Sequence, residues 1–163
     1  MLRKLYEKND MKGAIATFKA ATAMITGMGV VKDEATGEAK LPSAETADGI
    51  FFVDKARVVN GIKASLTDFS DYDTMFTDIA AGEKVLLVHA DDTDKIATDA
   101  YKASDMVADN VGKYVSVGTD GKWQLATGST NAVASRYVFI GTYNDVNHTL
   151  AVIEKVETAG KNA

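Results

Sequence analysis

The chain has 163 residues, the length of one domain, with 46% apolar residues, a formal net charge of −5 and no cysteine. This composition is that of a globular protein, and the lack of cysteine excludes disulfides, Cys-ligated zinc, iron–sulfur clusters and thiol nucleophiles. The acidic balance argues against a nucleic-acid partner, because binding to the phosphate backbone needs clustered Lys and Arg.

The N-terminal segment differs from the rest of the chain in charge. Residues 1–20 carry five Lys and Arg against two acids, whereas residues 68–109 carry eleven acids against three lysines. Leu2, Leu5 and Tyr6 recur at the i, i+3, i+4 spacing of a helix, which predicts one or two helical turns at the start of the chain. We therefore expect a basic attachment arm at 1–20, and an acidic, water-facing middle.

The N-terminal sequence does not predict a membrane partner. The apolar run Ala20–Gly27 is broken by Thr and is too short to cross a bilayer. Glu7 and Asp10 stand where a signal peptide would be positively charged. Neither a membrane span nor a signal peptide is therefore expected in this part of the chain.

From residue 21 onward, the chain shows the period of two that is typical of strands. Asn60-Gly61 and Thr119-Asp120-Gly121 indicate tight hairpin turns, and the polar segment 144–148 separates the last two strands. The expected strands, in chain order, are Thr22–Lys32, Gly49–Val53, Ala56–Asn60, Ile62–Leu66, Glu83–Ala90, Lys113–Val117, Lys122–Ala126, Arg136–Tyr143 and Leu150–Val156.

Helical signals are few. A short helix is predicted at Asp94–Ala103, with Thr93 or Asp94 as its cap, and a further turn at Asp71–Ala80. Many short strands with glycine turns predict a mainly β fold, namely a small antiparallel β-barrel or sandwich with an extended N-terminal arm and one or two short helices.

These elements predict a simple domain organisation. After the arm at 1–20, residues 21–158 are expected to form a single β-rich domain. Residues 159–163 are small or polar and are expected to form a tail.

Residue patterns that carry catalysis or bind cofactors are missing from the sequence. It has two histidines, His89 and His148, and no Gly-x-Ser-x-Gly motif that would place a nucleophile beside either. Asp91-Asp92-Thr93-Asp94 resembles half of a calcium loop but lacks the central Gly and the distal Glu. Gly27-Met28-Gly29 lacks the third glycine of a dinucleotide-binding turn. We predict no enzyme, no catalytic or metal-binding residue and no cofactor.

A pattern of strand entry and glycine turn recurs between residues 75 and 156. Residues 77–88 read Thr-Asp-Ile-Ala-Ala-Gly-Glu-Lys-Val-Leu-Leu-Val, and residues 112–123 read Gly-Lys-Tyr-Val-Ser-Val-Gly-Thr-Asp-Gly-Lys-Trp. Together with the closing strand Ala151–Val156, this pattern resembles small β-rich head proteins of tailed phages.

The resemblance implies a capsid decoration (cement) protein on the surface of a virion. Proteins of that kind bind the lattice of the major capsid protein, often as homo-oligomers, and brace it against internal pressure. Many shallow contacts suffice for this role, because avidity multiplies modest affinities. We expect the N-terminal arm to make the contacts through apolar anchors and basic side chains. The expected partner-binding residues are Leu2, Arg3, Lys4, Leu5, Tyr6 and Lys8.

Three other interpretations are left open by the sequence. The chain could serve elsewhere in a virion, as a tail tube, head–tail joining or fibre-base protein. It could instead be a β-rich binding module for a carbohydrate or small ligand, with Tyr114, Trp123 and Tyr137 lining the site. A hydrolase with dispersed carboxylates would require two acids that converge in a pocket.

Overall fold

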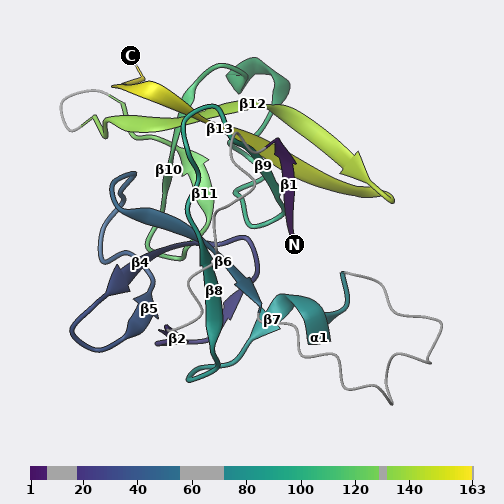
Figure 1. The fold of residues 1–163 in the computed structure, drawn as a ribbon. Coiled ribbons are helices and arrows are strands. Elements are labelled where there is room, and N and C mark those ends of the chain that lie inside the picture. Colours follow the sequence, from purple (N-terminus) through teal and green to yellow (C-terminus); the bar gives the residue numbers. More distant parts are fainter. Residues whose placement is uncertain (7–17, 56–71, 129–131, 163) are drawn as a thin grey trace.

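The computed structural model describes residues 1–6, 18–55, 72–128 and 132–162. About half of these residues lie in strands that form three sheets, and the helical elements among them are short (Figure 1). The prediction of a mainly β, largely antiparallel fold is confirmed. The described sheets do not form a closed barrel.

The largest sheet has six strands in the order β1-β9-β13-β12-β10-β11, and each neighbouring pair is antiparallel. It occupies the upper part of the molecule in Figure 1. Its strands are β1 (Leu2–Tyr6), β9 (Lys95–Thr98), β10 (Tyr114–Val117), β11 (Trp123–Leu125), β12 (Ser135–Asp145) and β13 (His148–Gly160).

A second sheet has five strands in the order β2-β5-β4-β6-β8, and a third pairs β3 with β7. The pair β2–β5 is parallel and the others are antiparallel. The strands are β2 (Lys19–Ala20), β3 (Met24–Ile25), β4 (Gly29–Asp33), β5 (Glu38–Lys40), β6 (Ile50–Lys55), β7 (Asp78–Ile79) and β8 (Val85–Val88). The helix α1 (Thr74–Thr77) precedes β7, and a 3₁₀ turn spans Ala108–Asn110.

The five-stranded sheet curves around its own apolar core. A single bridge between Lys19 and Lys84 brings the edge strand β2 to the start of β8. The core inside the curve is apolar and includes Phe18, Val30, Phe51, Val53, Ile79 and Leu87. Phe51 and Val53 both belong to β6. Because alternate residues of a strand face opposite sides, Phe52, which lies between them, points away from this core.

The two large sheets meet in a shared core on that opposite side. The Phe52 ring of β6 stacks on the Trp123 ring of β11, with centroids 4.7 Å apart, and Tyr137 of β12 packs edge-on against both rings. Trp123 is fully buried and its Nε1 donates a hydrogen bond to the Gly27 carbonyl. Burial of three aromatic rings accounts for much of the attraction between the sheets.

Backbone contacts fix the same junction. Gly29 of β4 donates its N–H to the Gly121 carbonyl, and Thr46 forms a bridge with Val117. A Cβ atom at Gly29 would lie 2.3 Å from Cγ2 of Val117, so only glycine permits this close approach.

Eight of the thirteen described strands coincide with predicted strands, although the single strand predicted at Thr22–Lys32 is divided into β3 and β4, which belong to different sheets. The hairpin with Asp120-Gly121 at its turn is confirmed as β10–β11, and Gly121 has a φ of +77°. The last predicted pair is confirmed as β12–β13, which extends beyond the expected bounds at both ends. The further turn expected in Asp71–Ala80 is confirmed by α1.

The predictions of one or two helical turns at the start of the chain and of a short helix at Asp94–Ala103 were wrong. The N-terminal residues Leu2–Tyr6 form a strand, because they pair with β9 in an antiparallel register that runs from Leu2↔Thr98 to Tyr6↔Lys95 and is interrupted only at Leu5. In the segment Asp94–Ala103, residues Lys95–Thr98 lie between β1 and β13 as β9. In both segments tertiary pairing outweighs a weak local helical signal.

Two further expectations concern the hairpin predicted between residues 56 and 66 and the tail predicted at residues 159–163. The predicted hairpin of Ala56–Asn60 and Ile62–Leu66 lies outside the described residues. In the predicted tail, β13 continues to Gly160, and Asn162 makes hydrogen bonds to both backbone groups of Tyr114 and to the Ala126 carbonyl. The end of the chain is therefore held against the start of β10.

Candidate docking surfaces

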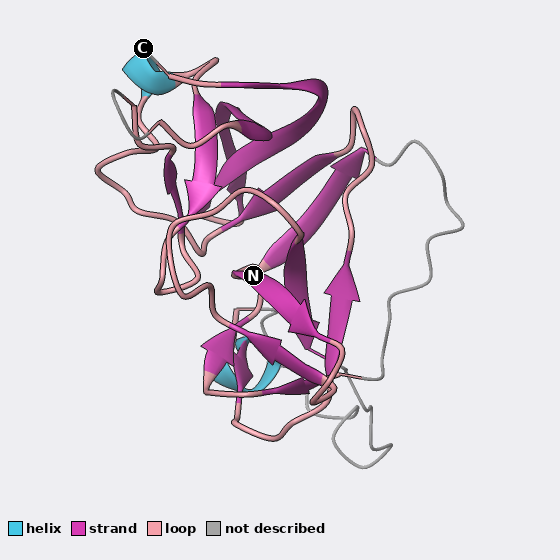
Figure 2. Ribbon diagram, turned by 90° about the vertical axis from the view of Figure 1, so that its left-hand side faces the viewer, coloured by secondary structure: helices cyan, strands magenta, loops and turns pink. Residues whose placement is uncertain are grey.

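Five of the six predicted partner-binding residues at the N-terminus, Leu2–Tyr6, form an edge strand of the six-stranded sheet. Figure 2 shows the N-terminus near the middle of the molecule, with β1 leading away from it. Met1 is buried, and its amino group donates to the Thr26 carbonyl at 3.0 Å and pairs with the Asp99 carboxylate. The start of the expected arm is thus part of the folded domain.

The six predicted contact residues have different surroundings. Leu2 is half-buried against the shared core. Arg3 donates from Nε to Asp145 Oδ2 at 2.7 Å, so its guanidinium is engaged within the chain. Lys4, Leu5 and Tyr6 are exposed, and Lys8 lies outside the described residues.

The apolar residues at the end of β1 owe their exposure to a bulge. The register with β9 shifts between Lys4 and Tyr6, so Leu5 has no partner position in the β1–β9 ladder. Leu5 is 41% exposed and Tyr6 is 53% exposed. We define Lys4, Leu5 and Tyr6 as the β1 patch. It places two large apolar side chains in solvent at the sheet edge.

The outer face of the sheet beside Arg3 carries a small apolar cluster. Leu150 and Val152 of β13 point to this face, whereas Ala151 and Ile153 point to the shared core. Met1 and Ala97 complete the buried cluster, and Tyr72 and Ile140 pack against it. These contacts anchor Met1, which precedes β1, and Tyr72, two residues before α1, to the β12–β13 hairpin.

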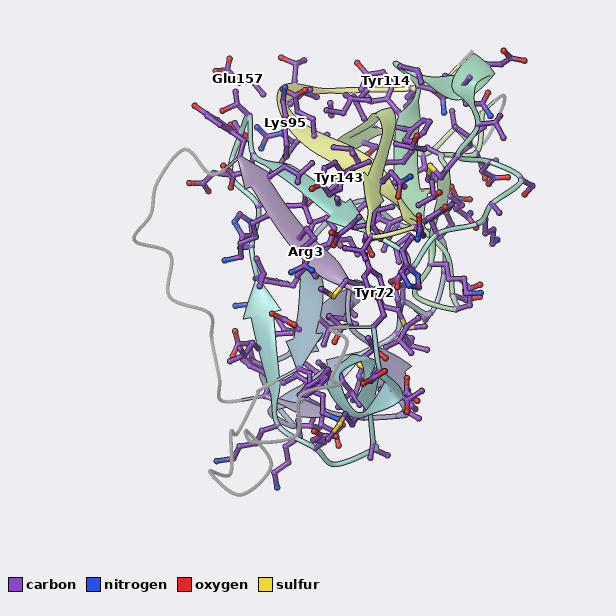
Figure 3. The ribbon with its side chains drawn as sticks, turned by 90° about the vertical axis from the view of Figure 1, so that its right-hand side faces the viewer. Arg3, Tyr72, Lys95, Tyr114, Tyr143 and Glu157 are labelled. Atoms are coloured by element: carbon purple, nitrogen blue, oxygen red, sulfur yellow. The ribbon has the colours of Figure 1, made fainter. Side chains whose placement is uncertain are left out.

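Tyr72 also clamps the tip of the β12–β13 hairpin. Its ring stacks on the His148 ring, with centroids 3.6 Å apart and planes inclined by 10°, and its hydroxyl donates to Asp145 Oδ2 at 3.0 Å. Burial, followed by this hydrogen bond, raises the pKa of Tyr72 to about 12. The hydrogen bond from Arg3 is the main cause that lowers the pKa of Asp145. Figure 3 shows Arg3, Tyr72 and Tyr143 on the same side of the molecule.

No pattern in the sequence indicated this clamp. The hydrogen bond from Arg3 to Asp145 joins residues 142 positions apart in the sequence. The hydrogen bond from Tyr72 to Asp145 joins residues 73 positions apart. The pairing of β1 with β9, of β9 with β13 and of β13 with β12 brings Arg3 close to Asp145, and Tyr72, which lies outside the sheet, packs against the same hairpin.

The proposed aromatic ligand site is wrong for two of its three residues. Trp123 and Tyr137 are buried in the shared core, where they contact each other and Phe52. Burial raises the pKa of Tyr137 well above its usual value, as expected for a core phenol. Only Tyr114 is partly accessible. These rings therefore do not form a platform for a sugar.

The acidic turn at 91–94 is held together by contacts of its own side chains. The Asp94 carboxylate accepts the Asp91 N–H at 2.7 Å, and Asp92 pairs with Arg136 at 2.7 Å. Oδ1 of Asp91 lies 3.7 Å from Nδ1 of His89. Within the described parts of the chain, no group of three or more His, Asp or Glu side chains is placed to hold a metal ion.

Comparison with family models, with curated proteins and with solved structures returned no match. None of the helices in the described ranges is long and apolar enough to span a membrane.

Proposed function

We propose that this chain is a non-enzymatic structural protein of a virion, which binds the lattice of the major capsid protein and stabilises the head. The observation that carries the proposal is the β1 patch, where Leu5 and Tyr6 expose apolar side chains on a rigid sheet edge. Rigid presentation favours binding, because little conformational entropy is lost on contact.

The mode of attachment differs from the one expected of an arm. Met1 is buried and Leu2–Tyr6 belong to the six-stranded sheet, so the contact is made by the folded domain itself. Individual contacts of this size are weak, and repeated copies on a symmetric lattice would supply the avidity. Homo-oligomerisation on the capsid surface belongs to the same proposal.

Point substitutions in the β1 patch test this proposal better than truncation. Deletion of residues 1–12 would remove β1 and the buried Met1, so a loss of binding would not separate docking from unfolding. The double variant Leu5→Ser with Tyr6→Ser keeps the backbone of β1 and removes both exposed apolar groups. Binding is measured by cosedimentation with purified capsid shells that lack this protein.

We expect the double variant to bind the shells at least about tenfold more weakly than the wild-type chain, with unchanged far-ultraviolet circular dichroism. The matched control is Val107→Ser with Val111→Ser, which removes two exposed apolar side chains beside the 3₁₀ turn. Equal binding by the wild-type chain and the β1 double variant would refute docking through this patch.

A further inference from the structure

The tip of the β12–β13 hairpin has an unfavourable backbone conformation. Asp145 pairs with His148, and the two residues between them, Val146 and Asn147, have φ values of +49° and +69°. A two-residue turn with positive φ at both positions suits Asn and Gly. For a β-branched residue such as Val146, this conformation is a rare and strained one.

Packing among the described residues does not compensate for this strain. Val146 is 80% exposed, the highest value among the exposed large apolar residues. The side chain therefore neither fits its backbone conformation nor fills a core. Strain that the fold does not require points to a role outside the fold.

The hairpin is nevertheless held in one position. Arg3 and Tyr72 both donate hydrogen bonds to Asp145, and the Tyr72 ring stacks on His148. Figure 1 shows the hairpin projecting past β1 and β9, away from the body of the sheet. The clamp thus presents Val146 on a braced support, which lowers the entropy lost when a partner binds.

The charge of the tip indicates the kind of partner. Within residues 142–149, Asp145 is the single Asp or Glu, no Lys or Arg is present, and Arg3 neutralises that acid. A nucleic acid or an anionic lipid surface would require clustered basic residues. An uncharged tip with an apolar apex fits a shallow, uncharged apolar pocket on a protein.

We propose that the hairpin tip is a second docking point, in which Val146 inserts into an apolar pocket on the capsid shell protein. This inference rests on the proposed function and adds a site to it. Tyr6 pairs with Lys95 of β9, and Lys95 pairs with Glu154 of β13. Glu154 is six residues from His148, the first residue of β13 after the hairpin tip. At about 3.3 Å per residue, the β1 patch and the tip are roughly 20 Å apart along the strands, so they make separate contacts.

The test uses Val146→Asn, which supplies a residue suited to the turn and removes the apolar apex. Relief of the strain should raise the Tm by about 2–4 °C, whereas binding to the same purified shells should fall at least about tenfold. The matched control is Val111→Asn, because Val111 is also exposed but has an ordinary φ of −61°. It should raise neither the Tm nor the dissociation constant.

Each outcome has a defined meaning. Weaker binding together with a higher Tm supports the inference, since a purely structural residue would not move the two quantities in opposite directions. Wild-type affinity in Val146→Asn overturns the second docking point but leaves the β1 patch intact. Failure of the wild-type chain to bind shells overturns the proposed function as well. A wild-type dimer in solution that Val146→Asn abolishes overturns the inference by making a second copy the occupant.

Discussion

Substitution of Gly29 by alanine tests how the two large sheets meet. The added Cβ would lie 2.3 Å from Cγ2 and 2.9 Å from Cγ1 of Val117. Carbon atoms in contact are normally about 3.5–4.0 Å apart, so one sheet must move by roughly 1 Å relative to the other or Val117 must leave its position. Val117 is fully buried and both of its backbone polar groups are bonded to Thr46, so neither movement is easy.

The expected cost lies at the upper end of the range for overpacked cores, about 3 kcal/mol. For a chain of 163 residues, this corresponds to a fall in Tm of roughly 6–12 °C. The free energy of unfolding can be measured by urea titration with the fluorescence of Trp123, the single tryptophan, which is buried at the same junction.

A double-mutant cycle separates this clash from other effects of alanine. In a Val117→Ala background the added methyl group has room, so Gly29→Ala should cost much less than it does alone. If instead the costs of Gly29→Ala and Val117→Ala simply add, or if Gly29→Ala alone costs less than about 0.5 kcal/mol, the close approach of β4 and β10 is not as described.

Three further predictions concern single polar groups. Thr26 Oγ1 is buried without a hydrogen-bond partner among the described residues, so Thr26→Val should stabilise the fold by about 1 kcal/mol in the same urea assay; a loss of stability would mean that the hydroxyl is paired. The hydrogen bond from Lys40 lowers the pKa of Asp33 to about 2, so the stability from this pair should be complete above about pH 4 and should be lost as the pH falls toward 2. Nuclear magnetic resonance titration of the Asp33 carboxyl should show this low midpoint, and Lys40→Met should raise it. Tyr72 has a raised pKa of about 12, so its stabilising effect should be complete below about pH 10 and lost as the pH rises through 12; ultraviolet titration of Tyr72→Phe should lack one late phenolate transition, and an unchanged titration would contradict the hydrogen bond to Asp145.

Local patterns in the sequence were sufficient for much of the fold. The turn at Asp120-Gly121 requires positive φ at glycine, and apolar and polar residues alternate in residues 115–117 and 123–125 on either side of it, so the β10–β11 hairpin could be predicted from adjacent residues. The β12–β13 hairpin was predicted from the polar segment 144–148 between two apolar runs, even though Val146 is an unusual residue for its turn.

Features that depend on distant pairing could not be predicted in this way. Leu2, Leu5 and Tyr6 satisfy a helical spacing over a single turn, and this signal is too weak to compete with a long-range ladder on β9. Exposure of Leu5 and Tyr6 follows from the bulge, which has no marker in the sequence.

The aromatic residues illustrate a different limit. Aromatic residues such as Trp123 and Tyr137 are equally typical of a ligand-stacking site and of a protein core. Whether these two rings bind a ligand or lie in the core depends on whether another sheet covers them. Phe52, on β6 of the five-stranded sheet, covers both rings. No pattern within β11 or β12 contains this information.

The long strand β13 has a mechanical consequence for a protein loaded at its hairpin tip. It runs between β9 and β12, and its backbone hydrogen bonds to both neighbours lie across the strand direction. A pull on the tip along the strand therefore shears these bonds together, whereas a pull normal to the sheet would peel them apart in succession. The sheet should thus resist tension best when the force acts along β13, from the hairpin tip toward Gly160.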